Sequence, residues 1–241
     1  MIATSFERRF SVPGGRSSLF LAAIFLGIAA APARATLQFS DWVTQPASPA
    51  TVAWHYSGGT ATLTGSVPVN FRFDNIPALP SSLQPATLTI TASTSVAGTL
   101  VGPLVTEPLS GSISISNGAN LLTIGFVGTI TGQQFGGNAT VSASAITPGD
   151  TVNFSSDFMT FLVTSGNSFQ IILPSIVAPP GLTLNVAGFI SDFTSNVQGS
   201  ASVASASDID PIPEPASLVS VCTGLAATGF LMMVRRRRMP G

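Results

Sequence analysis

Lysine is absent from this chain of 241 residues, and histidine and cysteine occur once each. Between the two ends, residues 36–210 contain one base, Arg72, no cysteine and eight acids, which gives this segment a net charge of −7. Nucleic-acid binding depends on clustered cations that displace counterions, so we expect no nucleic-acid partner. Without disulfides, the segment must be stabilised by apolar burial and backbone hydrogen bonds.

The residue types that carry catalysis or bind metals are also scarce. His55 is the only imidazole, and no serine stands in a G-x-S-x-G pattern. A zinc site needs several His or Cys ligands, so we predict no metal, no cofactor and no catalytic residue. Asp157, between apolar strand residues, is the acid that we expect to be half buried, as a turn carboxylate. Asp208 and Asp210 are candidate calcium ligands, but a solvated linker explains them better.

Aromatic residues are concentrated in one short stretch, Trp54-His55-Tyr56. On a strand, Trp54 and Tyr56 point to the same face and His55 points to the other. If that face is wet, the two rings are candidate glycan contacts, and if it is dry, they belong to the core. We favour the core, and keep the glycan contact as the alternative.

Strict alternation of apolar and polar residues predicts strands through most of residues 36–210. The clearest run covers 61–73, where every odd position is apolar or glycine and the even positions are polar apart from Pro68, which marks a break, bulge or edge. Turn signals such as Gly58-Gly59 and Asn117-Gly118 separate about eight to eleven short strands. We predict an all-β, antiparallel β-sandwich, with a jelly-roll or barrel variant left open.

The N-terminal residues 1–35 have the three parts of a secretory signal peptide. Arg8, Arg9 and Arg16 form a basic region, residues 19–31 are apolar, and Ala33-Arg34-Ala35 is a small-residue cleavage site. We expect a signal-peptide helix, export by the general secretory machinery and removal by signal peptidase after Ala35. The pair Arg8-Arg9 is weak evidence for a twin-arginine route.

The C-terminal residues 211–241 combine a short proline motif, an apolar segment and a basic cluster. Residues 216–234 contain no charge and would reach roughly 28 Å as a helix, close to the thickness of a bilayer core. We therefore predict a transmembrane helix there. Arg235, Arg236, Arg237 and Arg238 follow as a stop-transfer cluster on the cytoplasmic side.

Pro213-Glu214-Pro215, followed by that apolar segment and the arginine cluster, resembles the PEP-CTERM sorting signal of Gram-negative bacteria. The resemblance covers residues 213–238 only. It implies that Pro213, Glu214 and Pro215 are the sorting motif recognised by exosortase, a membrane protease that cuts near this motif and releases or re-attaches its cargo. It also implies an association with exopolysaccharide and biofilm. A plain C-terminal anchor is the alternative.

The ends therefore predict the location of the protein better than its activity. We expect an exported protein, transiently anchored in the inner membrane and then located at the cell surface or in the extracellular matrix. The first hypothesis is a structural or adhesive component without catalytic activity. A carbohydrate-binding module that uses Trp54 and Tyr56 is the second. A carbohydrate-active enzyme with a pair of carboxylates is the third, because eight acids allow such a pair.

Overall fold

The computed structural model describes residues 36–46, 48, 51–177 and 181–212, and more than half of these residues lie in strands. The strands are β1 (Leu37–Thr44), β2 (Val52–Ser57), β3 (Thr60–Phe73), β4 (Gln84–Thr94), β5 (Thr99–Val101), β6 (Leu104–Ser116), β7 (Asn120–Gln133), β8 (Ala139–Ser144), β9 (Thr151–Ser155), β10 (Met159–Phe161), β11 (Ser168–Leu173), β12 (Phe193–Ser195), β13 (Gln198–Val203) and β14 (Ile209–Pro211). A 3₁₀ turn, η2 (Ala206–Asp208), lies before β14.

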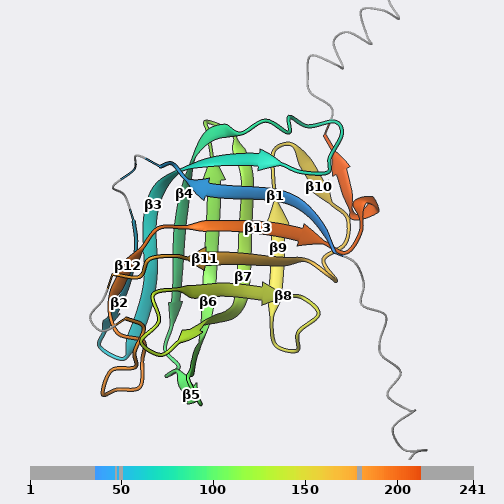
Figure 1. Ribbon diagram of the computed structural model, residues 1–241. Helices are drawn as coiled ribbons and strands as arrows, with labels where there is room; N and C mark the ends of the chain where they lie inside the picture. The colour runs from blue at the N-terminus through green and yellow to red at the C-terminus, as the bar shows by residue number, and fades with distance from the viewer. Residues whose placement is uncertain (1–35, 47, 49–50, 178–180, 213–241) are drawn as a thin grey trace, which may run out of the picture. The chain divides into compact units, whose positions relative to one another are not determined.

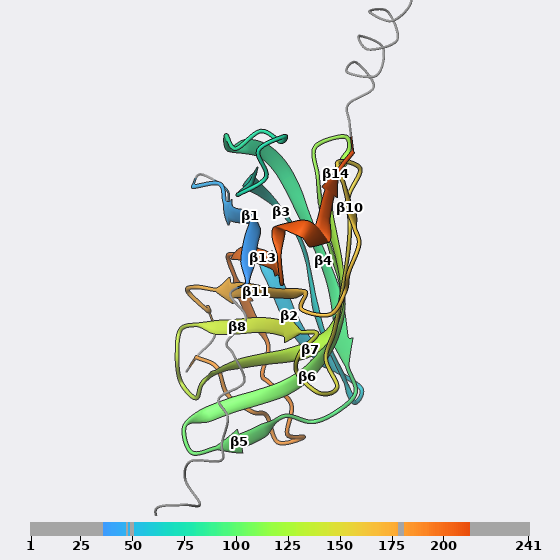
Figure 2. The same cartoon turned by 90° about the vertical axis from the view of Figure 1, so that its right-hand side faces the viewer.

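Eight antiparallel strands close into a barrel in the order β1-β13-β11-β8-β7-β6-β4-β3. Closure comes from β1, which pairs with β13 on one side and with β3 on the other. The predicted β-sandwich is therefore wrong, because a sandwich leaves edge strands where this ring has none. In Figure 1, β1, β13, β11 and β8 cross in front of β3, β4, β6 and β7, and Figure 2 shows the two walls from the side.

The alternation of apolar and polar residues predicts where strands lie, but it does not predict which strands pair with one another. Each strand of the ring turns one face inward and one outward, and this pattern is the same in a sandwich and in a barrel. On β3, for example, Val67, Val69 and Phe71 are fully buried, and Asn70 between them is half-exposed. Each such buried side chain stabilises the fold by about 1.5–3 kcal/mol relative to exposure.

Pro68 lies inside β3 without interrupting it. β3 pairs with β4 along 61–71, and Pro68 lies opposite Thr87 of β4. On its other side, β3 pairs with β2 over residues 60–64 and with β1 over residues 69–73. Pro68 falls between these two partners, where no ladder hydrogen bond requires its missing N–H, so the prediction of an edge position is confirmed locally.

Additional strands extend the barrel wall. β2 and β12 continue the sheet beyond β3, β5 pairs with β6, and β9 pairs with β7. β10 and β14 form a separate two-stranded sheet, and β14 brings residues 209–211 into the fold. This placement corrects the prediction that residues from Asp208 onward form a linker, because Ile209 is buried and pairs with Phe161.

The predicted flanking helices form no part of the described structure. The signal-peptide helix expected within residues 1–35 and the transmembrane helix expected over 216–234 lie outside the described residues. Within the described ranges, no helix is long and apolar enough to span a bilayer. The helix-flanked sandwich is thus corrected to an all-β barrel.

One arginine holds the seam at which the barrel closes. Asp41 of β1 lies opposite Arg72 of β3, and its two oxygens accept hydrogen bonds from Nε and Nη2 of Arg72 at 2.8 and 2.7 Å. Asp74 approaches the same Nε at 3.1 Å. The hydrogen bond to Asp41 and the two negative charges raise the pKa of Arg72. Arg72 thus joins β1 to β3 and separates two carboxylates.

Replacing Arg72 by glutamine should destabilise the barrel, because Arg72→Gln leaves Asp41 and Asp74 close together without a cation. We expect a lower midpoint of denaturant-induced unfolding, measured on the full-length chain by the change in β-sheet circular dichroism. The difference from the parent should shrink at high salt, since salt screens the repulsion. Equal midpoints for parent and variant at low salt would contradict this role for Arg72.

Candidate functional site

The outward face of β8, β11 and β13 is hollowed into a polar groove. Two adjoining hollows of about 430 and 300 Å³ form it, and both are lined by Gln170 and Ser200. The first hollow is also lined by Thr129, Ser142, Ala143, Ser144, Thr147, Asp150, Ser168, Phe169 and Ser202, and the second by Gln38, Asp41, Trp42, Val43, Ile172, Gln198 and Gly199. Together the hollows, which we call the groove, run from β7 to β1.

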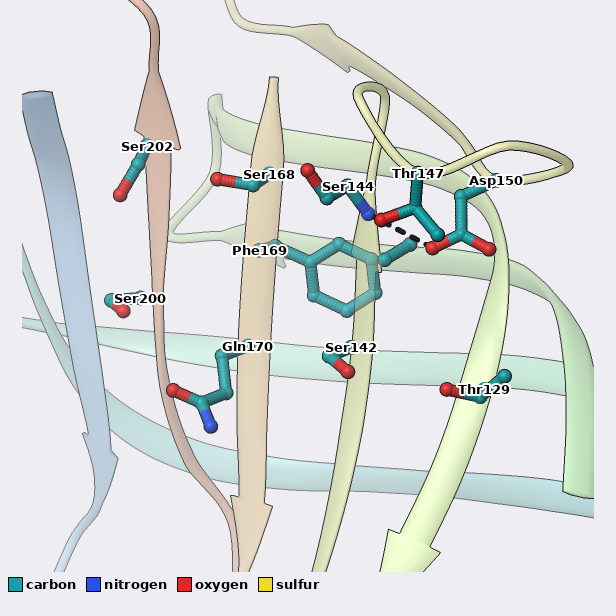
Figure 3. Close-up of a pocket in the computed structure, with 11 residues that line it drawn as sticks. Thr129, Ser142, Ser144, Thr147, Asp150, Ser168, Phe169, Gln170, Ser200 and Ser202 are labelled. Carbon is teal, nitrogen blue, oxygen red and sulfur yellow. Dashed lines mark hydrogen bonds between the residues drawn. The ribbon is translucent and has the colours of Figure 1, made fainter. Parts of the chain in front are cut away.

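Local sequence explains why this face is hollow. On β11, Phe169, Ile171 and Leu173 point into the barrel, and Ser168 and Gln170 point outward. The outward positions of β8 and β13 are mostly serines, whose short side chains leave space above the sheet. The β8–β9 connection forms a rim with Thr147 and Asp150, and the Ser144 N–H donates to Asp150 Oδ2 at 3.2 Å. Figure 3 shows these polar side chains on one face.

Most hydrogen-bonding groups of the groove have no partner inside the protein. Among the described residues, seven hydroxyls of the first hollow make no side-chain hydrogen bond to another residue: those of Thr129, Ser142, Ser144, Thr147, Ser168, Ser200 and Ser202. The side-chain amide of Gln170 is likewise unused, and Gln170 is exposed. Each group both donates and accepts, so the groove offers a dense set of hydrogen bonds to a bound molecule.

Charge and aromatic contact contribute little to the groove. Its charged lining residues are Asp150 and Asp41, and Asp41 is paired with Arg72. Phe169 and Trp42 line it from below, but they are only 4% and 2% exposed because both belong to the barrel core. The groove therefore suits a neutral, hydroxyl-rich molecule held by hydrogen bonds. It offers neither an exposed aromatic platform nor an unpaired cation.

The aromatic pair that the sequence singled out lies elsewhere, in the core. Trp54 is 1% exposed, and its indole Nε1 donates to the carbonyl of Ile190 at 3.0 Å. Tyr56 is half-buried and stacks on Phe189, with ring centroids 4.7 Å apart. Trp54 presents no face to solvent and Tyr56 packs against the core, so their burial favours the core interpretation over the candidate glycan contact.

His55 is hydrogen-bonded to Asp192 at the surface. Its Nδ1 lies 2.7 Å from Asp192 Oδ2, and Asp192 Oδ1 accepts the backbone N–H of Tyr56 at 2.8 Å. The backbone hydrogen bond from Tyr56, and secondarily His55, lower the pKa of Asp192. The one hydroxyl bonded to His55 belongs to Thr62, and it donates to the backbone carbonyl. In the described residues this pair fastens β2 to the segment before β12 and forms no catalytic triad.

The other candidate acids have structural roles. Asp157 is exposed, and its Oδ2 accepts the backbone N–H of Asn120 at 2.7 Å, which confirms the turn-carboxylate interpretation but corrects its expected burial. Asp208 Oδ2 accepts the N–H of Ser205 and caps η2, and Asp210 is exposed on β14. Across the described ranges, no three or more His, Cys, Asp or Glu side chains gather as a metal site.

Glu107 is a buried acid that the sequence analysis missed. It lies on β6 opposite Ile130 of β7, and its side chain is 0% exposed inside the barrel. Oε2 accepts the backbone N–H of Ile190 at 2.6 Å, and Oε1 has no partner among the described residues. Burial raises the pKa of Glu107 to about 7, although the hydrogen bond from Ile190 opposes the shift. Glu107 lines neither hollow of the groove.

The raised pKa of Glu107 predicts a pH-dependent stability. Between pH 4.5 and 7 the folded chain retains the proton that the unfolded chain loses, so the free energy of unfolding falls as pH rises. The loss should reach about 3 kcal/mol by pH 8. Denaturant titrations at pH 5 and pH 8 measure it, and Glu107→Gln, which cannot titrate, should remove this part of the slope. The same slope in parent and variant would contradict a buried, titrating Glu107.

The residues of the two ends lie outside the described residues. These are the cleavage-site residues Ala33 and Ala35, the sorting motif Pro213, Glu214 and Pro215, and the stop-transfer cluster Arg235, Arg236, Arg237 and Arg238. Comparisons of the chain with protein-family models, with curated proteins and with solved structures found no match.

Proposed function

We propose that the chain is an exported, non-catalytic component of the cell surface or exopolysaccharide matrix, and that it holds neutral polysaccharide in the groove. Export is supported by the signal-peptide pattern of residues 1–35. Sorting by an exosortase-like membrane protease is supported by the resemblance of Pro213-Glu214-Pro215 and the residues after it to the PEP-CTERM signal. Both supports come from the sequence.

The observation that carries the binding proposal is the groove itself. It combines a concave surface with hydroxyl and amide groups that lack partners in the protein. The same kind of side chain covers the outer face of β4 and β6, for example Thr89 and Ser112, but neither lines the groove. The groove adds concavity to these groups, and a concave site surrounds more of a ligand.

Polarity of the groove favours a structural rather than a catalytic role. A hydrogen bond that replaces one to water contributes only about 0.5–1.5 kcal/mol, so binding by a single chain should be weak. Weak binding suffices in a matrix, because a long polysaccharide presents many copies of its repeat and many protein molecules engage it together. The acids Asp41 and Asp150 would repel polyanions, which favours neutral polymers.

Changing Gln170 to leucine should weaken polysaccharide binding, because Gln170→Leu removes the exposed amide shared by both hollows. We expect the full-length parent to be retarded in native gels containing a neutral polysaccharide, tested with cellulose derivatives, xylan, mannan, starch and dextran. The variant should show a dissociation constant about three- to tenfold larger.

The matched control is Thr89→Leu on β4, which adds the same side chain to the flat hydroxyl-rich wall and should leave retardation unchanged. Polygalacturonate serves as the acidic comparison and should retard the parent less than the neutral polymers do. No retardation of the parent by any of these polymers, or equal losses in both variants, would refute polysaccharide binding by the groove.

Sorting makes a separate prediction. Replacing Pro213, Glu214 and Pro215 by alanine should block processing, because the motif is the proposed recognition element of the protease. Intact mass spectrometry of the chain from its native host should then find the C-terminal residues retained in the variant and lost in the parent. An identical mature mass for both would contradict sorting by this motif.

A further inference from the structure

The groove's polar side chains fall into two rows that cross the strands. Strand register places Thr129 opposite Ser142, Ser142 opposite Gln170, and Gln170 opposite Ser200. Ser200 in turn lies opposite Asp41 of β1. The first row thus takes one outward side chain from each of five neighbouring strands and spans about 19 Å, since adjacent strands lie about 4.8 Å apart.

A second row runs beside the first. Ser144 lies opposite Ser168, Ser168 opposite Ser202, and Ser202 opposite Gln38. Ser144, Ser168 and Ser202 each lie two residues along their strand from a member of the first row, so the rows are about 7 Å apart there. On β1, Gln38 lies three residues from Asp41, because the strand has a bulge between Gln38 and Ser40. Figure 3 shows Ser202, Ser168 and Ser144 in one line, and Ser200, Gln170, Ser142 and Thr129 in the other.

The run of outward polar side chains is longer across the strands than along β11, the central strand of the groove. Along β11, the outward side chain after Ser168 and Gln170 is Ile172, which ends the polar run. Across the strands, both hollows include Gln170 and Ser200, so the depression extends from β7 to β1. A bound polymer therefore meets the largest number of unpartnered hydroxyl groups when it lies across the strands.

From this arrangement we infer that the groove holds one extended, ribbon-like, neutral polysaccharide chain across the strands, with each edge of the ribbon facing one row of hydroxyls. The inference rests on the proposed function and adds the conformation and direction of the ligand. One sugar residue of an extended chain is close in length to one strand-to-strand step, so the first row accommodates about four sugars. A coiled polysaccharide presents its hydroxyls around a helix and does not match two straight rows.

The length of the ligand tests this inference. The probes are β-1,4-linked gluco-, manno- and xylo-oligosaccharides of two to six residues, titrated into the full-length chain by calorimetry or by NMR shifts. For at least one series, affinity should rise with each added sugar up to about four residues and then level off. Binding of starch or dextran fragments with no binding of any β-1,4 series would overturn the extended-chain inference and leave polysaccharide binding standing.

Direction is tested by two threonines, one inside the first row and one outside both rows. Thr129 belongs to the first row, whereas Thr140 lies two residues from Ser142 on β8 and lines neither hollow. Thr129→Val and Thr140→Val each remove one hydroxyl and keep the shape of the side chain. Thr129→Val should weaken binding of the hexasaccharide about three- to tenfold, and Thr140→Val should change it by less than twofold.

The reverse pattern, with the larger loss in Thr140→Val, would place the ligand along β8 and overturn the direction that we infer. If both threonine variants lose almost no affinity while Gln170→Leu still binds weakly, the ligand contacts only the middle of the groove. That result would also overturn the inference that the ligand crosses all five strands. Failure of every polysaccharide and oligosaccharide to bind the parent would instead refute the proposed function, and the inference with it. Unchanged thermal midpoints of both variants establish that each is folded.

Discussion

The double pairing of β1 is the constraint on which the rest of the structure depends. β1 joins β13 along one edge and β3 along the other, and this closes the sheet so that the inward faces of eight strands share one core. The segment that contains β1 holds no cysteine. The seam is therefore held by backbone hydrogen bonds, by the Arg72 ion pairs and by buried side chains such as Phe39 and Trp42. Closure also brings Asp41 into line with Ser200 and so completes the groove.

The mostly apolar barrel interior also contains buried polar atoms. Three buried polar atoms have no partner among the described residues, and they are Ser40 Oγ, Trp42 Nε1 and Glu107 Oε1. An unsatisfied buried polar group costs about 1–3 kcal/mol, so these positions reduce the stability that the core provides. Glu107 adds a dependence on pH near neutrality, because burial raises its pKa to about 7 against the opposing effect of the hydrogen bond from Ile190.

Much of the secondary structure was predictable from alternation, and the closure was not. The alternation of residues 61–73 predicts β3, and Asn117-Gly118 predicts the turn between β6 and β7. Period alone does not tell which strands meet at the ends of a sheet, so the pairing of β1 with both β13 and β3 could not be predicted. Glu107 was available to the same reasoning, since it continues the inward series of Val105, Leu109 and Ile113.

The candidate site, like the fold, could be predicted from the sequence only in part. The structure places hydroxyl side chains on both walls of the barrel. Only strand register, which joins residues far apart in the sequence, shows that Ser142, Gln170 and Ser200 form one row. The aromatic stretch around Trp54 attracted attention because glycan sites often use rings, but those rings fill the core. Location was predicted from the two ends, and the binding surface had to come from the fold.

The most direct test of this account is a residue-by-residue map of where neutral polysaccharide fragments touch the full-length chain, obtained from NMR chemical-shift changes of backbone amides and Gln side-chain amides. The account predicts that the largest changes lie on β8, β11 and β13, centred on Gln170. Changes centred on the hydroxyl-rich wall of β4 and β6, with the groove unperturbed, would contradict it.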